Sequence, residues 1–169
     1  MNKSFRLIIL FLSLFSLQVF SQDLNHCTVK SHSCEFYQCA ENTFQCGDSG
    51  YFKAFAAPYC GLFLSESFLQ KNSAVTQKWL IEVASCLQQS IKDAAAKNNK
   101  LNCSQIRLKA INAHAQCYYK TGFCQIPRND RMLLARVLIK DTWNDFDILK
   151  QGLQIQKLCG PQWQQDFDN

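Results

Sequence analysis

The side chains in this sequence with the most chemical potential are ten cysteines and three histidines. Three of the cysteines, Cys34, Cys39 and Cys46, lie within thirteen residues, and His26 and His32 lie just upstream of them. Such a group could hold zinc, supply a catalytic thiol or cross-link the chain. Structural zinc sites usually place paired cysteines about two to four residues apart. The gaps here are four and six residues, with no Cys-x-x-Cys motif, which argues against zinc.

The start of the chain indicates the compartment in which these cysteines would act. Lys3 and Arg6 precede an apolar run from Leu7 to Phe20, which is the pattern of a secretory signal peptide. The competing interpretation is a membrane anchor, but the run is short for a membrane span of about 20 apolar residues. We expect residues 1–21 to be removed before Gln22, so that 22–169 form one secreted, extracellular domain without a stable membrane anchor.

All ten cysteines lie in the predicted mature part, and an even number in an oxidising compartment predicts five disulfides. Arithmetic alone leaves about 945 possible pairings.

Catalytic chemistry finds little support in the remaining residues. A bridged cysteine cannot act as a nucleophile, and His114 lies within an apolar helical pattern typical of a hydrogen-bonded, partly buried ring. Secreted phospholipases are also helical and cysteine-rich, but they place a His-Asp pair beside adjacent cysteines. In this chain no two cysteines are neighbours and no histidine precedes an aspartate. We expect no enzyme activity, no cofactor and no metal.

Two weaker motifs concern calcium and glycosylation. The sequence GDSG at 47–50 resembles part of an acidic loop, but residues 51–60 contain no acid, so a turn is the simpler interpretation. Asn102-Cys103-Ser104 fits the glycosylation sequon and makes Asn102 a candidate site.

The net charge excludes little by itself. It is +5 for the whole chain, and subtracting Lys3 and Arg6 leaves +3. Arg128, Arg131, Arg136 and Lys140 could share one face of a helix, which we interpret as a solvated face. No aromatic RNA-binding signature accompanies them, and we expect no nucleic-acid partner.

Helical periodicity dominates the body of the chain and predicts an all-α fold. Ser73 can cap a helix that runs from Val75 past Ile91. Ser104 or Asn102 can cap a second one that stops at Gly122. Residues 51–70 read as an aromatic helix kinked or restarted at Pro58. Asn129 and Asn144 can cap two further helices, the last over 146–158.

The cysteine spacing is the most specific feature of the sequence. From Cys34 onward the intervals contain 4, 6, 13, 25, 16, 13, 6 and 34 residues. This order resembles that of the stanniocalcin family, secreted helical glycoprotein hormones. The segment CEFYQCAENTFQCGDSG resembles the head motif of that family, and CSQIRLKAINAHAQCYYKTGFC resembles a later element, including Tyr118 after Cys117.

The resemblance covers residues 27–159 and implies a disulfide map. The implied pairs are Cys27–Cys39, Cys34–Cys60, Cys46–Cys103, Cys86–Cys117 and Cys124–Cys159.

The chain also departs from the family pattern. The sequence ENTF has no hydroxyl residue where a sequon at Asn42 would need one, and the stretch between Cys46 and Cys60 is several residues longer than in the family. The eleventh cysteine, which joins two stanniocalcin subunits, has no counterpart here. The expectation is a short, divergent member that forms no covalent dimer, while a noncovalent homodimer stays open.

Two functions follow as hypotheses. The resemblance implies a hormone-like signalling protein that binds an extracellular receptor or target protein, with a role in calcium or phosphate homeostasis. The alternative is a secreted lipid-binding or lipolytic helical domain, which the aromatic run from Tyr51 to Phe68 favours. Aromatic residues of this kind are more often part of a core than of a lipid-binding surface.

Overall fold

Helices are the only regular secondary structure in the residues that the computed structural model describes, 23–142 and 146–160, as the periodicity predicts. The predicted signal peptide, residues 1–21, lies outside these ranges. The elements in chain order are α1 (Glu35–Phe44), the π-helical η3 (Phe52–Ala56), α2 (Ala57–Phe63), α3 (Glu66–Leu69), α4 (Ala74–Lys97), α5 (Cys103–Lys120), the 3-10 turn η4 (Phe123–Gln125), α6 (Arg128–Thr142) and α7 (Phe146–Cys159).

The two longest helices begin at predicted caps. The Ser73 hydroxyl accepts a hydrogen bond from the Thr76 amide at 3.4 Å and starts α4. Of the two candidates for α5, the structure selects Asn102. Its side chain accepts from the Gln105 amide at 2.9 Å, and the Gln105 side chain accepts from the Asn102 amide at 3.0 Å, forming a capping box.

Other helix boundaries agree with the prediction only in part. The restart expected at Pro58 agrees with the structure, because η3 ends at Ala56 and α2 begins at Ala57 with Pro58 in its first turn, where its missing N–H costs nothing. A further break that was not expected occurs at Ser65, whose hydroxyl caps α3 by accepting from the Phe68 amide. Helix α6 already begins at Arg128, so Asn129 lies in its first turn and does not cap it. Asn144 lies outside the described residues.

Helix α1 occupies a segment that the sequence suggests only as a cysteine-rich head. It buries Phe36, Tyr37, Ala40 and Phe44, which are spaced by one, three and four residues and so share one helical face. The expected turn follows at 47–50, where the Gly50 amide donates to the Gly47 carbonyl at 2.9 Å.

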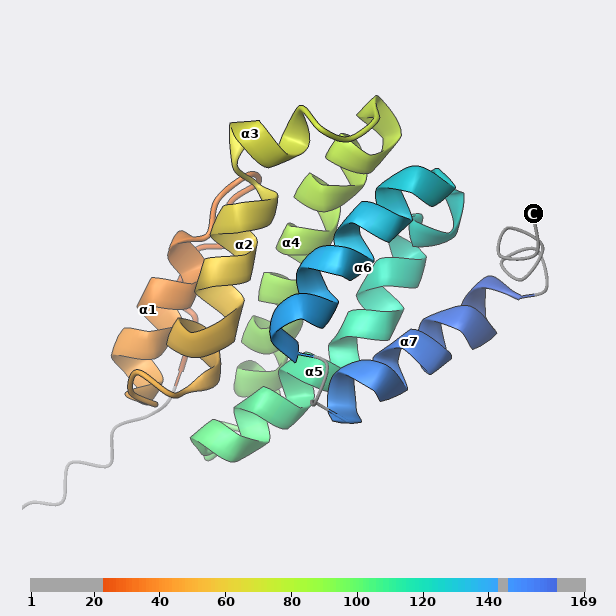
Figure 1. Ribbon diagram of the computed structural model, residues 1–169. Helices are drawn as coiled ribbons and strands as arrows, with labels where there is room; N and C mark the ends of the chain where they lie inside the picture. The colour runs from red at the N-terminus through yellow and green to blue at the C-terminus, as the bar shows by residue number, and fades with distance from the viewer. Residues whose placement is uncertain (1–22, 143–145, 161–169) are drawn as a thin grey trace, which may run out of the picture.

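The helices pack around one hydrophobic core (Figure 1). Helix α4 lies along α5, α5 packs against α7, and η3 joins α1 to α2 at the other side of the molecule. Phe36, Phe52, Ile91 and Ile106 are among the most completely buried side chains of this core. Helix α6 lies in front of α4 and α5 in Figure 1 and continues towards α7.

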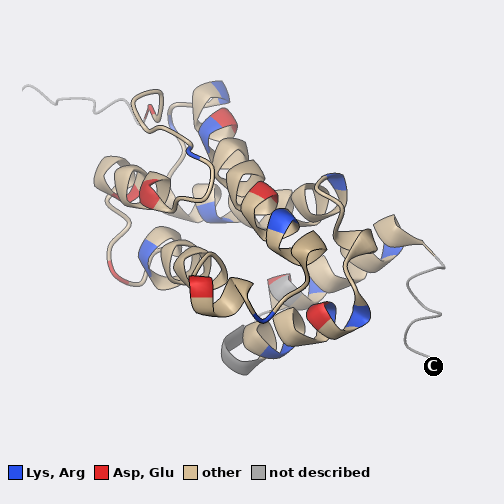
Figure 2. Cartoon of the chain, turned by 90° about the horizontal axis from the view of Figure 1, so that it is seen from above, with Lys and Arg blue, Asp and Glu red and all other residues tan. Residues whose placement is uncertain are grey.

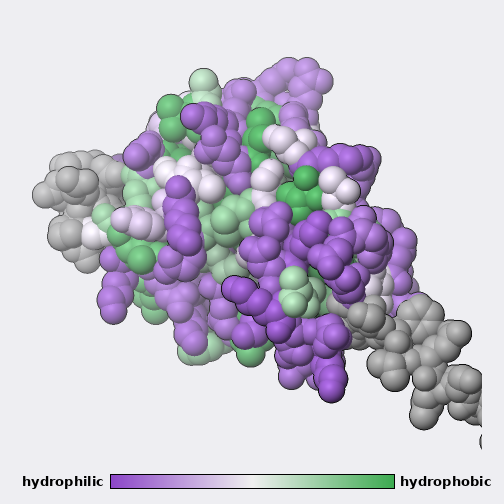
Figure 3. Space-filling view, turned by 180° about the vertical axis from the view of Figure 1, so that it is seen from behind, coloured by the Kyte–Doolittle hydropathy of each residue, from purple (hydrophilic) through white to green (hydrophobic). Residues whose placement is uncertain are grey.

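The surface carries charges of both signs (Figure 2). In Figure 2 the Lys and Arg positions are distributed over several helices among Asp and Glu positions. The face turned away from α6 is mostly hydrophilic, with small hydrophobic areas between the polar side chains (Figure 3). The predicted solvated face of α6 is only partly correct. Arg128 and Arg136 are exposed, but Arg131 is buried and donates to the Ile126 carbonyl at 3.0 Å.

Candidate functional site

The ten cysteines all lie within the described residues, and they form five disulfides without leaving a free thiol. The bridges are Cys27–Cys39, Cys34–Cys60, Cys46–Cys103, Cys86–Cys117 and Cys124–Cys159. These are the pairs that the stanniocalcin resemblance implies. Since a disulfide sulfur is neither a thiolate nucleophile nor a thiolate ligand, the cysteines act as cross-links. Five disulfides indicate an oxidising environment.

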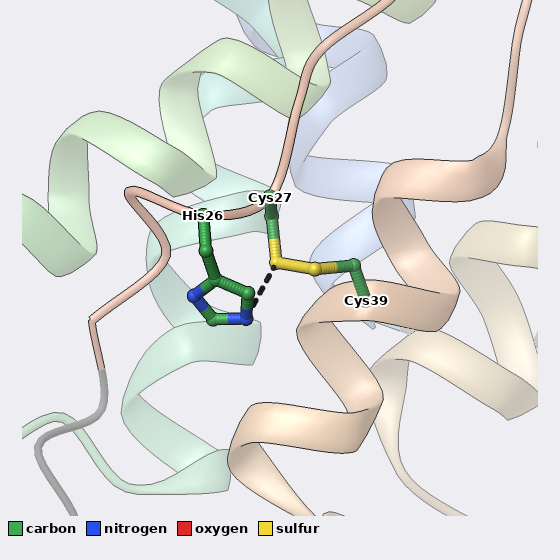
Figure 4. A group of neighbouring side chains, drawn as sticks. All are labelled: His26, Cys27 and Cys39. Atoms are coloured by element: carbon green, nitrogen blue, oxygen red, sulfur yellow. Dashed lines mark hydrogen bonds between the residues drawn. A yellow bond between two sulfur atoms is a disulfide. The ribbon is translucent and has the colours of Figure 1, made fainter.

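One group of potential metal ligands is explained by this pairing. The His26 Nε2 atom lies 3.5 Å from the Cys27 sulfur, which is itself bonded to Cys39 (Figure 4). The same nitrogen lies 3.3 Å from the Thr43 hydroxyl. Zinc sites use thiolates, so the two bridged sulfurs do not provide the donor set that such a site requires.

The other two histidines have structural partners. His32 Nε2 lies 3.3 Å from the Leu64 carbonyl and connects the N-terminal segment to the end of α2. His114 is buried in α5, with Nδ1 2.8 Å from the Ala110 carbonyl, as predicted for a hydrogen-bonded ring. Burial lowers the pKa of His114, although hydrogen bonds to the backbone partly oppose this shift. The ring is therefore neutral at pH 7.

Between the helices lies an apolar cavity of about 710 Å³ that is partly open to the surface. Helix α4 contributes Trp79, Leu80, Val83, Ala84 and Leu87 to its wall. Helices α6 and α7 close the opposite side with Leu134, Ala135, Leu138, Leu149 and Ile155, among others. Protein interiors are normally packed as densely as organic crystals, whereas ligand sites are apolar spaces of about 300–1,000 Å³. The cavity therefore has the size and lining of a binding site.

A ladder of aromatic rings forms the third wall of the cavity. Tyr51, Phe55, Tyr59 and Phe63 recur every four residues along η3 and α2, and successive ring centroids lie 5.9, 4.7 and 5.9 Å apart. A spacing of four is longer than an α-helical turn, so such a ladder would rotate around a regular α-helix. The π-helical η3, with its longer hydrogen-bonded turn, counteracts this drift at the first step, from Tyr51 to Phe55.

A few polar side chains interrupt the apolar lining. Tyr37 and Tyr51 are 3% and 6% exposed, and burial raises the pKa of both hydroxyls. Burial also raises the pKa of Tyr118 to about 12, so all three hydroxyls stay protonated at neutral pH. The Trp79 Nε1–H is buried and finds no acceptor among the described residues. These groups could donate hydrogen bonds to a molecule inside the cavity.

The cavity reaches the surface between α6 and α7. Met132, Ile139, Leu149 and Leu153 line it and are 39%, 57%, 56% and 67% exposed. Near this opening, Arg107 on α5 donates to the Asp147 carboxylate on α7 at 2.9 Å, and both side chains are partly exposed. A ligand could therefore enter past an apolar rim without unfolding the helices.

No family model, curated protein or solved structure matches this chain. Among the helices of the described segments, none combines the length and apolar character needed to cross a bilayer.

The cavity itself was not predicted from the sequence. The residue types of the aromatic run favour burial in the core, but in the structure Phe52 is core while Phe55, Tyr59 and Phe63 line the cavity. The four-residue spacing of these rings is the feature of the sequence that could have indicated the cavity.

The candidate glycosylation site, Asn102, is exposed, but its side-chain oxygen caps α5. Its glycosylation stays a prediction.

Proposed function

We propose that this protein is a secreted binding protein that carries a hydrophobic small molecule in the cavity between α2, α4, α5, α6 and α7. The observation that carries the proposal is the cavity of about 710 Å³ with its predominantly apolar wall. An apolar wall offers water few hydrogen bonds, so such a space is filled favourably by apolar molecules. The five disulfides and the predicted signal peptide support secretion.

The wall composition favours binding over lipolysis. Hydrolysis of an ester needs a nucleophile activated by a neighbouring base. The described residues that line the cavity include no serine, threonine or carboxylate, and the lining cysteine, Cys60, is bridged to Cys34. His114 thus has no nucleophile beside it in this wall. Of the two activities in the lipid hypothesis, we propose binding without catalysis.

A cavity-filling variant tests the proposal directly. Ala84 is 8% exposed and lines the cavity from α4, so Ala84→Trp should fill part of the space. The native protein should enhance the fluorescence of a naphthylamine probe with a stoichiometry of one, and the variant should weaken this binding at least about tenfold. Ala135→Trp repeats the test from α6 in case the first variant fails to fold.

Asn112→Trp is the matched control, because Asn112 is exposed on α5 and adds the same side chain away from the cavity. Circular dichroism would show that each variant keeps its helices. Unchanged probe binding in a folded Ala84→Trp variant would contradict the proposal.

A second candidate is a hormone-like signalling protein of the stanniocalcin type, which would act on an extracellular receptor in calcium or phosphate homeostasis. The observation that favours it is the agreement between the five bridges and the pairs that the resemblance implies. Labelled protein should then bind saturably to cells and alter their calcium or phosphate uptake. Unsaturable binding with no change in ion uptake would argue against this role.

A further inference from the structure

We propose that the ligand of this cavity is a neutral amphiphile, whose hydroxyl or carbonyl head contacts a cluster formed by Tyr37, Tyr51, Tyr118 and Trp79 while its hydrocarbon part extends towards the opening between α6 and α7. This inference rests on the proposed binding function and specifies the chemical class of the ligand.

The four side chains of the cluster come from different parts of the chain. Tyr37 lies in α1, Tyr51 directly precedes η3, Trp79 lies in α4 and Tyr118 in α5. The rings of Trp79 and Tyr118 meet edge to face with centroids 5.2 Å apart, and the three tyrosines are near enough to influence one another electrostatically. All four line the same cavity.

The hydrogen-bonding capacity of the cluster is not used within the protein. The Trp79 Nε1–H is buried without an acceptor. In the part of the chain that the structure describes, the hydroxyls of Tyr37, Tyr51 and Tyr118 make no hydrogen bond to protein. Buried polar groups are almost always paired, because leaving them unpaired costs their full desolvation. The buried Trp79 Nε1–H without an acceptor, beside three tyrosines that line the same cavity, indicates that a ligand supplies hydrogen-bond partners in this wall.

His114 adds a hydrogen-bond acceptor to this cluster. Its Nδ1 lies 2.8 Å from the Ala110 carbonyl, which can only accept, so Nδ1 carries the proton and Nε2 keeps a lone pair. His114 contacts Tyr118 with ring centroids 5.8 Å apart and also lines the cavity. The cluster and His114 together can donate a hydrogen bond to a ligand hydroxyl and accept one from it.

The charge distribution favours a neutral head over a carboxylate. His114 is neutral, and Arg107, the cation whose charge reaches Tyr51, forms an ion pair with Asp147. Arg131 is the one cation among the described lining residues, and one of its N–H groups already donates to the Ile126 carbonyl. A buried anion needs a paired cation, whereas a hydroxyl or carbonyl needs only hydrogen bonds.

The orientation follows from exposure. Tyr37, Tyr51 and Trp79 are each less than one-tenth exposed, whereas Ile139, Leu149 and Leu153 are more than half exposed. Polar groups therefore lie at the inner end and apolar groups at the opening. A ligand would therefore enter with its polar head first and leave its hydrocarbon part at the opening.

The test compares dodecanol with dodecane and dodecanoate at neutral pH, by displacement of the naphthylamine probe from the intact, oxidised protein. Dodecanol should bind best. Tyr51→Phe and Tyr118→Phe should each weaken dodecanol binding about fivefold and leave dodecane binding unchanged, since each loses one hydrogen bond at nearly constant shape. Tyr119→Phe is the matched control, because Tyr119 is 46% exposed and does not line the cavity.

Equal affinities for dodecanol and dodecane, or tighter binding of dodecanoate that depends on Arg131, would overturn the inference while leaving the binding function intact. If none of the three compounds displaces the probe, the proposed function fails instead.

Discussion

At the residue scale, one carboxylate connects the two helices that face each other across the cavity. Asp130 in α6 accepts hydrogen bonds from the Ser73 amide, the Ser73 hydroxyl and the Thr76 hydroxyl at 2.9, 2.6 and 2.7 Å. Burial alone would raise the pKa of Asp130, but these hydrogen bonds together outweigh it and hold the pKa below its ordinary value. The start of α6 is thereby fixed to the start of α4.

We predict that Asp130→Asn lowers the free energy of unfolding by about 2 kcal/mol at neutral pH, the usual contribution of hydrogen bonds to a charged group. Because the pKa of Asp130 is lower in the folded protein, the advantage of the wild type persists above the ordinary value of 3.8 and is lost as the pH falls through the folded pKa. Urea unfolding of both proteins at several pH values measures this difference in the free energy of unfolding. Asp93→Asn, on the exposed face of α4, should have little effect.

A second prediction concerns His114, whose pKa burial lowers from 6.5. Below that pH the unfolded chain binds a proton that the folded protein does not, so stability should fall as the pH decreases from about 6.5 to the folded pKa. His114→Leu should remove this part of the pH dependence, as measured by thermal unfolding across the range. An unchanged profile in the variant, or the same change in the exposed control His26→Gln, would contradict it.

At the scale of elements, α7 is held to the rest of the protein near both ends. Asp147 in its first turn pairs with Arg107 of α5, and Cys159 at its end is bridged to Cys124. Leu149, Leu153 and Ile155 between these points line the cavity. The position of α7 therefore determines the shape of the opening.

We predict that replacing Cys124 and Cys159 by alanine lowers the free energy of unfolding by about 3 kcal/mol, since the bridge closes a loop with a separation of 35 residues. Hydrogen exchange should accelerate in α7 more than in α4, and the naphthylamine probe should dissociate faster. Uniform acceleration of hydrogen exchange along the chain, with an unchanged rate of probe dissociation, would contradict the prediction that this bridge holds α7 in particular.

At the scale of the whole molecule, the disulfides connect elements that are distant in sequence. Cys46–Cys103 and Cys86–Cys117 have separations of 57 and 31 residues and join the segment after α1, α4 and α5. The cavity lies among the elements that these bridges join. A fold with a large empty space has fewer packing contacts to hold it, and cross-links compensate by destabilising the unfolded chain.

Peptide mapping under nonreducing conditions should recover five intrachain links with the pairs described above and no titratable thiol. Reduction should abolish both the helical circular dichroism and the probe binding. A different set of pairs, or a link between two chains, would contradict the map. Light scattering of the same oxidised sample would decide whether a noncovalent homodimer forms.

The sequence alone determined the helical class and the main helix starts, because capping and periodicity are local properties. Ser73 and Asn102 illustrate this, since each hydroxyl or amide oxygen accepts from an amide three residues later. The disulfide pairs were implied only through a resemblance in spacing. From local reasoning, Cys46 could have paired with any other cysteine.

The location of the cavity depends on how distant segments pack together. Phe52 and Phe55 are three residues apart in one aromatic run, yet Phe52 is fully buried in the core while Phe55 faces the cavity. That difference depends on the π-helical turn between them and on where α6 and α7 lie, and the position of those two helices is set by Asp130, Arg107 and Cys159. A cavity is defined by the walls that several distant segments form together, and no local pattern encodes it.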